Sequence, residues 1–217
     1  MVDSYGNAAH IGHDKMCASC GRFVSETDIQ LADGRHICKE CDAYSVRTDR
    51  QMEWVTKRVR QYLAQHGIDD LPGKIQTDIV SPETLASHLH TTPDSMGQQQ
   101  GLTITTSMLM FQSHRILLLD HLHRVAAAGV MGHELLHVWQ NEHSIHLAPM
   151  LTEGFCNLGS YIVYRHIGND MARVLAGQMA KSPDPVYGDG YRLVKAVFDH
   201  AGDRSLVSTM NELRKMN

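Results

Sequence analysis

The stretch VMGHELLHVWQ, residues 130–140, places two histidines and a glutamate in an otherwise apolar run. Residues four positions apart share one face of a helix, so the imidazoles of His133 and His137 can reach the same zinc ion. Glu134, beside the first histidine, is placed to take a proton from the water that such a zinc activates. About 0.04 matches to this HExxH pattern are expected by chance in a chain of this composition. The alternative is a core helix whose polar side chains have found ordinary partners.

A third ligand is predicted on the helix that follows. A catalytic zinc site needs three protein ligands and one open position. Glu153, which comes after a proline turn, meets this need, whereas Glu142 follows the second histidine too closely to swing back onto the same ion. The alternative for Glu153 is a first-turn glutamate stabilised by the helix dipole. Asn157 is either a hydrogen-bond partner of a ligand or a simple polar position, and Cys156 is expected to be a small core residue.

Four of the five cysteines form two CxxC pairs, at Cys17, Cys20, Cys38 and Cys41. Their spacing suits a four-cysteine zinc site, and a segment this short and polar needs such a staple to fold. We therefore expect a LIM-like or zinc-ribbon module over residues 17–46, preceded by a flexible tail over residues 1–16. Disulfides and unpaired core cysteines are the alternatives. An odd cysteine count concentrated in one segment indicates a reducing compartment, so the cytoplasm is the expected location.

The composition excludes several classes of protein. The chain has 217 residues, of which 42% are hydrophobic, enough to build a core within residues 47–217. It has no secretory signal and no apolar run of about 18 residues or more, so neither secretion nor a membrane span is expected. The formal net charge is −4, and the cysteine-rich module has no basic patch, which argues against nucleic acid and favours contact with proteins.

The apolar pattern predicts an α+β domain. Strands are expected over residues 74–80, 102–106 and 115–120. Helices are expected over 48–66, 125–140 and 151–166, with two more after the turn-rich stretch at 181–190. Ser81 followed by Pro82 marks the start of a further short helix, and Gly129 and Gly132 weaken the prediction of the motif helix. A few strands followed by several helices favour the α+β class.

Several motifs occur together in the order found in a known family. They are QGLTIT before RILLLD, then GHELLHVWQ, EGFCNL and YGDGYR. With the cysteine-rich segment, they resemble the "DA-one" family of plant organ-size regulators, LIM-domain proteins with a C-terminal zinc-peptidase domain. The resemblance implies a minimal gluzincin fold, in which a small twisted sheet of three or four strands accompanies the HExxH helix and a glutamate helix. It also implies that His133, His137 and Glu153 bind zinc and that Glu134 is the general base.

The chain also departs from that family. A full LIM domain binds two zinc ions, and the cysteines here are enough for one. Nothing in residues 1–16 resembles the ubiquitin-interacting segments of the plant proteins. The chain is therefore more similar to a compact bacterial relative, for which ubiquitin-pathway substrates are not implied.

These observations together predict a metallopeptidase with one catalytic and one structural zinc, acting on peptide or protein substrates. Tyr191 is the expected hydrogen-bond donor to the developing oxyanion, with Tyr187 as second choice. The strand around Ile116–Leu119 is expected to offer its edge to an extended peptide. The rival prediction is a non-catalytic adaptor that binds protein partners through the zinc module and a peptidase-like fold.

Overall fold

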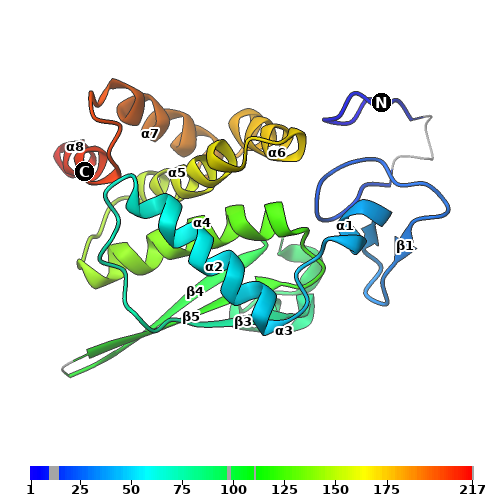
Figure 1. The fold of residues 1–217 in the computed structure, drawn as a ribbon, viewed down its shortest axis with the longest axis horizontal. Coiled ribbons are helices and arrows are strands. Elements are labelled where there is room, and N and C mark those ends of the chain that lie inside the picture. The colour runs from blue at the N-terminus through cyan, green and yellow to red at the C-terminus, as the bar shows by residue number, and fades with distance from the viewer. Residues whose placement is uncertain (10–14, 97–98, 110, 217) are drawn as a thin grey trace.

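The structure is a computed structural model that describes residues 1–9, 15–96, 99–109 and 111–216. It has the predicted α+β class: helices cover a three-stranded sheet, and a small cysteine-rich module lies at one end (Figure 1). The sheet contains, in spatial order, β3 (Gln76–Val80), β5 (Phe111–Leu119) and β4 (Gly101–Met108). β3 runs parallel to β5, and β4 runs antiparallel to it. All three strands overlap the predicted segments, two of which were predicted from alternating apolar residues and the third from a short apolar run.

β5 is the central strand, and its second half is apolar on both faces. Its residues Ile116, Leu117 and Leu118 are fully buried, as the run RILLLD indicates. The prediction that the strand around Ile116–Leu119 offers a free edge is wrong. Ile116 is paired with Thr77 of β3 on one side and with Thr103 of β4 on the other. β4 is an edge strand of this sheet, and its outer side is unpaired within the described residues.

The helices α4 (Arg124–Glu142) and α5 (Pro149–Ile167) pack against each other at unusually close range. A Cβ atom on Gly159 would lie 2.2 Å from the carbonyl oxygen of Gly132, and one on Gly132 would lie 2.8 Å from the carbonyl oxygen of Gly159. Glycine permits this approach of two backbones, and any larger residue would force them apart. Gly132, one of the two glycines that weaken the helix prediction, therefore allows the two central helices to pack closely.

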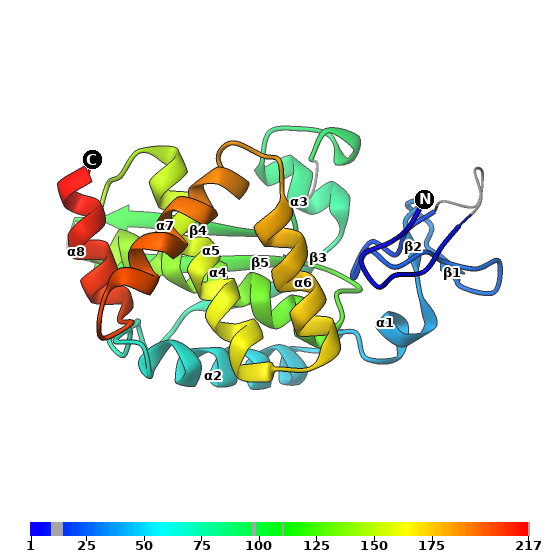
Figure 2. The same cartoon turned by 90° about the horizontal axis from the view of Figure 1, so that it is seen from above.

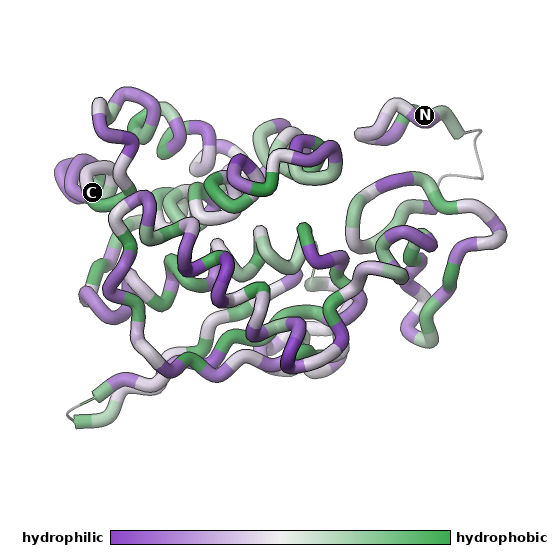
Figure 3. Tube along the Cα trace, viewed as in Figure 1, coloured by the Kyte–Doolittle hydropathy of each residue, from purple (hydrophilic) through white to green (hydrophobic). Residues whose placement is uncertain are grey.

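The remaining helices are distributed around this pair, the sheet and one another. They are α2 (Asp49–Ala64), α3 (Pro82–His88), α6 (Asp170–Lys181), α7 (Gly188–His200) and α8 (Leu206–Met216), with a 3-10 turn, η1, at Pro93–Ser95. α2, which mixes hydrophilic and hydrophobic residues (Figure 3), packs against α4, while α6 and α7 cover α5 (Figure 2). The sequence did not predict α6, and α7 begins inside the stretch expected to be a loop. No helix in the described ranges is both long and apolar enough to cross a membrane.

The cysteine-rich module is built from very short elements. They are β1 (Ile29–Gln30), β2 (His36–Ile37) and α1 (Lys39–Ala43). In residues 1–9, part of the expected tail, the buried Asp3 carboxylate accepts a hydrogen bond from the Phe23 N–H at 2.9 Å. The first residues therefore pack onto the module, and residues 10–14 of the expected tail lie outside the described residues.

The module is docked on the helical body rather than separate from it. Ile37 of the module shares a buried apolar cluster with Val125 of α4 and Met171 of α6. The Arg35 guanidinium of the module forms an ion pair with Asp120, just after β5. These contacts place the module against the first turn of α4, the helix that carries the HExxH motif.

Candidate active site and metal centres

Three side chains on two neighbouring helices direct their donor atoms toward one point. The Nε2 atoms of His133 and His137, both on α4, are 3.1 Å apart. Oε2 of Glu153, on α5, lies 3.2 Å from the first nitrogen and 3.5 Å from the second. Donors bound tetrahedrally to zinc at about 2.0–2.2 Å are separated from each other by about 3.3–3.6 Å. The observed distances are close to these values, so the three residues, termed the helix cluster, could hold one metal ion.

The carboxylate of Glu153 gives independent support for a cation at this point. Its Oε2 atom is buried and has no hydrogen-bond partner among the described residues, although two imidazole nitrogens are near. An unsatisfied buried oxygen costs free energy, and a cation between the three donors would remove that cost. Burial opposes the charge on Glu153, but the nearby imidazoles outweigh it and lower the pKa of the carboxyl to about 2. The carboxylate is therefore ionised at neutral pH, as a metal ligand must be.

Asn157 orients one of the histidines. Its Oδ1 atom lies 3.0 Å from Nδ1 of His133, and its Nδ2 donates a hydrogen bond to the Tyr187 carbonyl at 3.0 Å. When Nδ1 of His133 donates to this oxygen, the lone pair of Nε2 is left free for a metal. Of the two interpretations of Asn157, a hydrogen-bond partner of His133 fits the structure better than a simple polar position.

Glu134 lies beside the helix cluster and against strand β4. Only 5% of the residue is exposed, and its Oε2 accepts a hydrogen bond from the Thr103 hydroxyl at 2.7 Å. A Cβ atom on Gly101 would lie 2.7 Å from Oε1 of Glu134, so glycine is needed where the strand passes the carboxylate. Thr103 and Gly101 were not recognised in the sequence, because their contact with Glu134 depends on how β4 packs on α4.

Of the two candidate tyrosines, the structure brings the second choice to the cluster. Tyr191 is buried in α7 and packs on Tyr161, with ring centroids 6.3 Å apart. Burial, followed by the charge of Tyr161, raises the pKa of Tyr191, and neither site carboxylate contributes. The Tyr187 ring, in contrast, lies 6.4 Å from the His133 ring. Burial and then the charges of both site glutamates raise the pKa of Tyr187 to about 12, so this phenol lies near the cluster.

Two other side chains could compete as ligands. The Cys156 sulfur lies within 4.8 Å of a ligand atom of each cluster histidine. Burial raises the pKa of this thiol well above its usual range, and the thiol donates a hydrogen bond to Gln140 Oε1 at 3.6 Å. At neutral pH the thiol is therefore protonated, whereas Glu153 is ionised. Glu142 is engaged elsewhere, because its Oε1 lies 2.5 Å from His114 Nε2. The ionised Glu153 is therefore the better third ligand.

The cysteines of the module form a second cluster, termed the cysteine cluster. Its members Cys17, Cys20, Cys38 and Cys41 are buried and free, with all sulfur atoms within 4.8 Å of one another. The sulfurs of Cys20 and Cys38 are 3.9 Å apart, and four thiolates around zinc at about 2.3 Å are separated by about 3.8 Å. Hydrogen bonds from the other three cysteines lower the pKa of Cys17, and the Cys38 N–H also donates to its sulfur at 3.3 Å. This arrangement could hold one metal ion and contains no disulfide.

Comparison with protein-family models, curated proteins and solved structures found no match to this chain. A fold of this general class supports many chemistries, so function must be inferred from the two clusters themselves. The structure brings together every metal ligand predicted from the sequence. It adds Thr103 against Glu134, brings Tyr187, the second choice, near His133, and leaves Tyr191 outside.

Proposed function

We propose that this chain is a zinc metallopeptidase of the minimal gluzincin type, resembling the "DA-one" peptidases, with a second, structural zinc in the cysteine cluster. The observation that carries the proposal is the convergence of His133, His137 and Glu153 on one point, with a buried oxygen that has no other partner. Two histidines and a glutamate are a typical donor set for catalytic zinc, whereas four cysteines make a closed structural site. A zinc ion in the helix cluster would polarise the scissile carbonyl and make water more acidic.

The residues around the helix cluster have distinct tasks in this reaction. Glu134 takes a proton from the attacking water and passes it to the leaving amine. Its Oε2 is held by Thr103, so Oε1 is the atom that faces the water. Asn157 keeps the His133 ring in the orientation that ligation needs. Tyr187, whose pKa of about 12 keeps it protonated, donates a hydrogen bond to the oxyanion as it develops.

The position of β4 supports a peptide as the substrate. Thr103 and Gly101 of this strand both touch Glu134, and the outer edge of the strand is unpaired within the described residues. An extended peptide that adds to this edge would run beside the general base. Peptides and unfolded protein segments can adopt that conformation, so they are the proposed substrates. Five free cysteines favour a reducing compartment, and we place the protein in the cytoplasm.

The test replaces the general base and leaves the metal ligands intact. Glu134→Gln should lower the rate of peptide cleavage by about 10²–10⁴-fold, because general-base catalysis contributes that much. Cleavage is followed by mass spectrometry of products from an unfolded protein, and both zinc ions should remain bound. Glu142→Gln is the matched control, since this glutamate lies on the same helix and pairs with His114. Cleavage at the native rate by a clean Glu134→Gln preparation would refute the mechanism. A single zinc, lost only with the cysteines, would favour the adaptor.

A further inference from the structure

A pocket of about 360 Å³ lies at the junction between the cysteine-rich module and the helical body. Its walls come from the linker after α1, the first turns of α2 and the start of α4, and we call it the junction pocket. The linker is fixed to the body, since the Val46 N–H donates to the Leu122 carbonyl at 2.9 Å and the Arg124 N–H donates to the Tyr44 carbonyl at 3.0 Å. The linker wall of the pocket is therefore held against the start of α4 by backbone hydrogen bonds.

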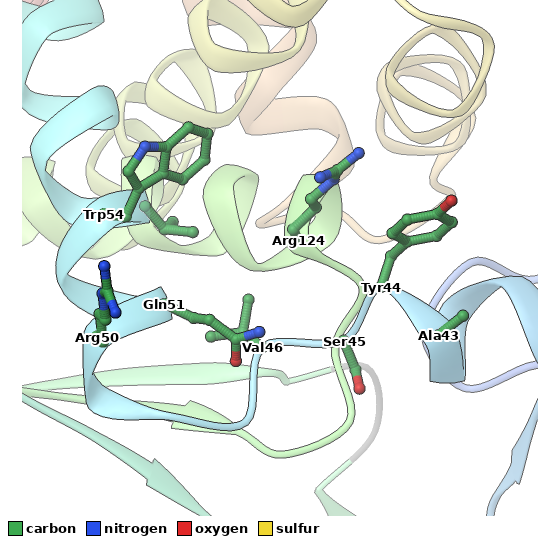
Figure 4. A pocket seen from close by; sticks show the side chains of 9 residues that line it. Ala43, Tyr44, Ser45, Val46, Arg50, Gln51, Trp54 and Arg124 are labelled. Atoms are coloured by element: carbon green, nitrogen blue, oxygen red, sulfur yellow. The ribbon is translucent and has the colours of Figure 1, made fainter.

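Two aromatic side chains stand exposed around the junction pocket. Trp54 is 57% exposed and Tyr44 is 51% exposed, while Val46 and Val55 close the floor. Figure 4 shows Trp54, Arg124 and Tyr44 projecting to the same side of the linker. Tryptophan, tyrosine and arginine are the residue types that contribute most to binding at protein interfaces. The combination of an apolar floor with exposed aromatic walls suits the insertion of one large apolar side chain.

The charged residues that line the junction pocket are positive. Arg50 and Arg124 line it, and none of its lining residues is acidic. Within the described part of the chain, neither guanidinium forms an ion pair with a carboxylate. Arg124 instead lies over the Tyr44 ring, 4.9 Å from its centroid. Since α2 and α4 both begin here, their partial positive charges add to the same field. An anionic partner would therefore be attracted to this pocket.

We propose that the junction pocket binds an acidic peptide segment of a partner protein. One apolar side chain of that segment sits between Trp54 and Tyr44, and flanking carboxylates face Arg50 and Arg124. A nucleic acid fits less well, because the floor made by Val46 and Val55 is apolar and the lining offers only two guanidinium groups to a phosphate backbone. A pocket of this volume is at the lower end of the range for ligand sites, about 300–1,000 Å³, which suits a single side chain.

This surface is separate from the helix cluster. Arg124 and His133 are nine positions apart on α4, which corresponds to about 14 Å along the helix and about half a turn around it. Peptide binding at the junction pocket therefore does not depend on peptidase activity at the helix cluster. If the chain is a peptidase, the junction pocket would recruit proteins rather than position the scissile bond.

The test uses the full chain and a short fluorescent peptide in which one Phe is flanked by Glu residues. Fluorescence anisotropy should show binding that weakens at least about tenfold in Arg50→Glu and Arg124→Glu, and in Trp54→Ala. Lys57→Glu is the matched control, because it makes the same change of charge on the same helix outside the pocket and should bind normally. Two control peptides, with Phe replaced by Ala or with Glu replaced by Lys, should bind at least about tenfold more weakly.

Several results would overturn the proposal. Equal binding of the control peptides, or equal loss of binding in Lys57→Glu, would show a non-specific charge effect. Tighter binding of a single-stranded oligonucleotide, with the same dependence on Arg50 and Trp54, would assign the surface to nucleic acid instead. Self-association of the native chain that disappears in Trp54→Ala would assign it to a second copy. Circular dichroism of each variant establishes that the loss of binding is not a loss of fold.

Discussion

The two candidate metal-binding clusters differ in how the chain assembles them. The four ligands of the cysteine cluster lie within residues 17–41, two on each tight turn, in a module with little apolar interior. The ligands of the helix cluster come from α4 and α5, whose packing is set by fully buried residues such as Leu135, Leu136 and Phe155. Metal binding should therefore be required for the module to fold, whereas the helix cluster is preformed by the core.

The largest predicted effect is the loss of a cysteine ligand. Cys38→Ser should unfold the module, because apparent zinc binding supplies about 10–16 kcal/mol in comparable small domains. Limited proteolysis should then cut within residues 17–46 and leave the helical body intact. Cys156→Ala is the control, since this cysteine belongs to neither proposed ligand set, and it should keep both zinc ions. If the zinc-free module of Cys38→Ser resists proteolysis as the native chain does, the contrast between the clusters is wrong.

The second prediction concerns the close approach of α4 and α5. Gly159→Ala would place a Cβ atom 2.2 Å from the Gly132 carbonyl oxygen, so the helices must separate. We expect a loss of about 1–3 kcal/mol of unfolding free energy in urea titrations. The helix cluster should also lose zinc affinity, while the cysteine cluster keeps its own. Gly177→Ala in α6 meets no atom within 4 Å, and unchanged or slightly increased stability is expected there. Equal effects of the two substitutions would contradict the packing argument.

The third prediction isolates the orientation of His133. Asn157→Ala removes the acceptor for its Nδ1, and the zinc affinity of the helix cluster should fall by about 10–100-fold. Competition with a zinc chelator measures this affinity, and the affinity of the cysteine cluster serves as the internal reference. Asn157→Asp retains an acceptor oxygen and should recover most of the loss. A uniform change at both clusters would point to general destabilisation instead.

The smallest predicted effect is a pH dependence at the contact between the two regions. Burial, followed by the charge of Arg124, lowers the pKa of His123 below its usual 6.5. The unfolded chain therefore binds a proton more readily, and the stability that comes from neutral His123 is lost as the pH falls from 6.5 to the lowered value. Neutral His123 also accepts a hydrogen bond from the Val125 N–H at 3.1 Å, which caps α4.

The variant His123→Asn separates this titration from the loss of metal at acid pH. Asparagine retains a side-chain acceptor for the Val125 N–H but does not titrate. Thermal unfolding of both proteins between about pH 5 and 8 should show a steeper decline for the native chain. Parallel curves would exclude His123 as the titrating group.

Most of the candidate ligands could be predicted from the sequence because their patterns are local. The i,i+4 spacing of His133 and His137 and the two CxxC pairs depend only on a helix turn or a tight turn. The free edge of the sheet was predicted wrongly, because strand order depends on tertiary packing. Tyr187 was ranked below Tyr191, because the sequence does not reveal where α7 begins or how it packs. Gly132 is an example. It lowers the helix propensity of α4, but the close packing against Gly159, 27 positions away, leaves no room for a Cβ atom.

The central claim is that α4 and α5 form a metal centre separate from the cysteine cluster. Native mass spectrometry of the purified protein counts the bound zinc ions directly. The native chain should carry two zinc ions, and Glu153→Ala should carry one while remaining folded. A native chain with a single zinc, or a Glu153→Ala chain that retains both, would contradict the account.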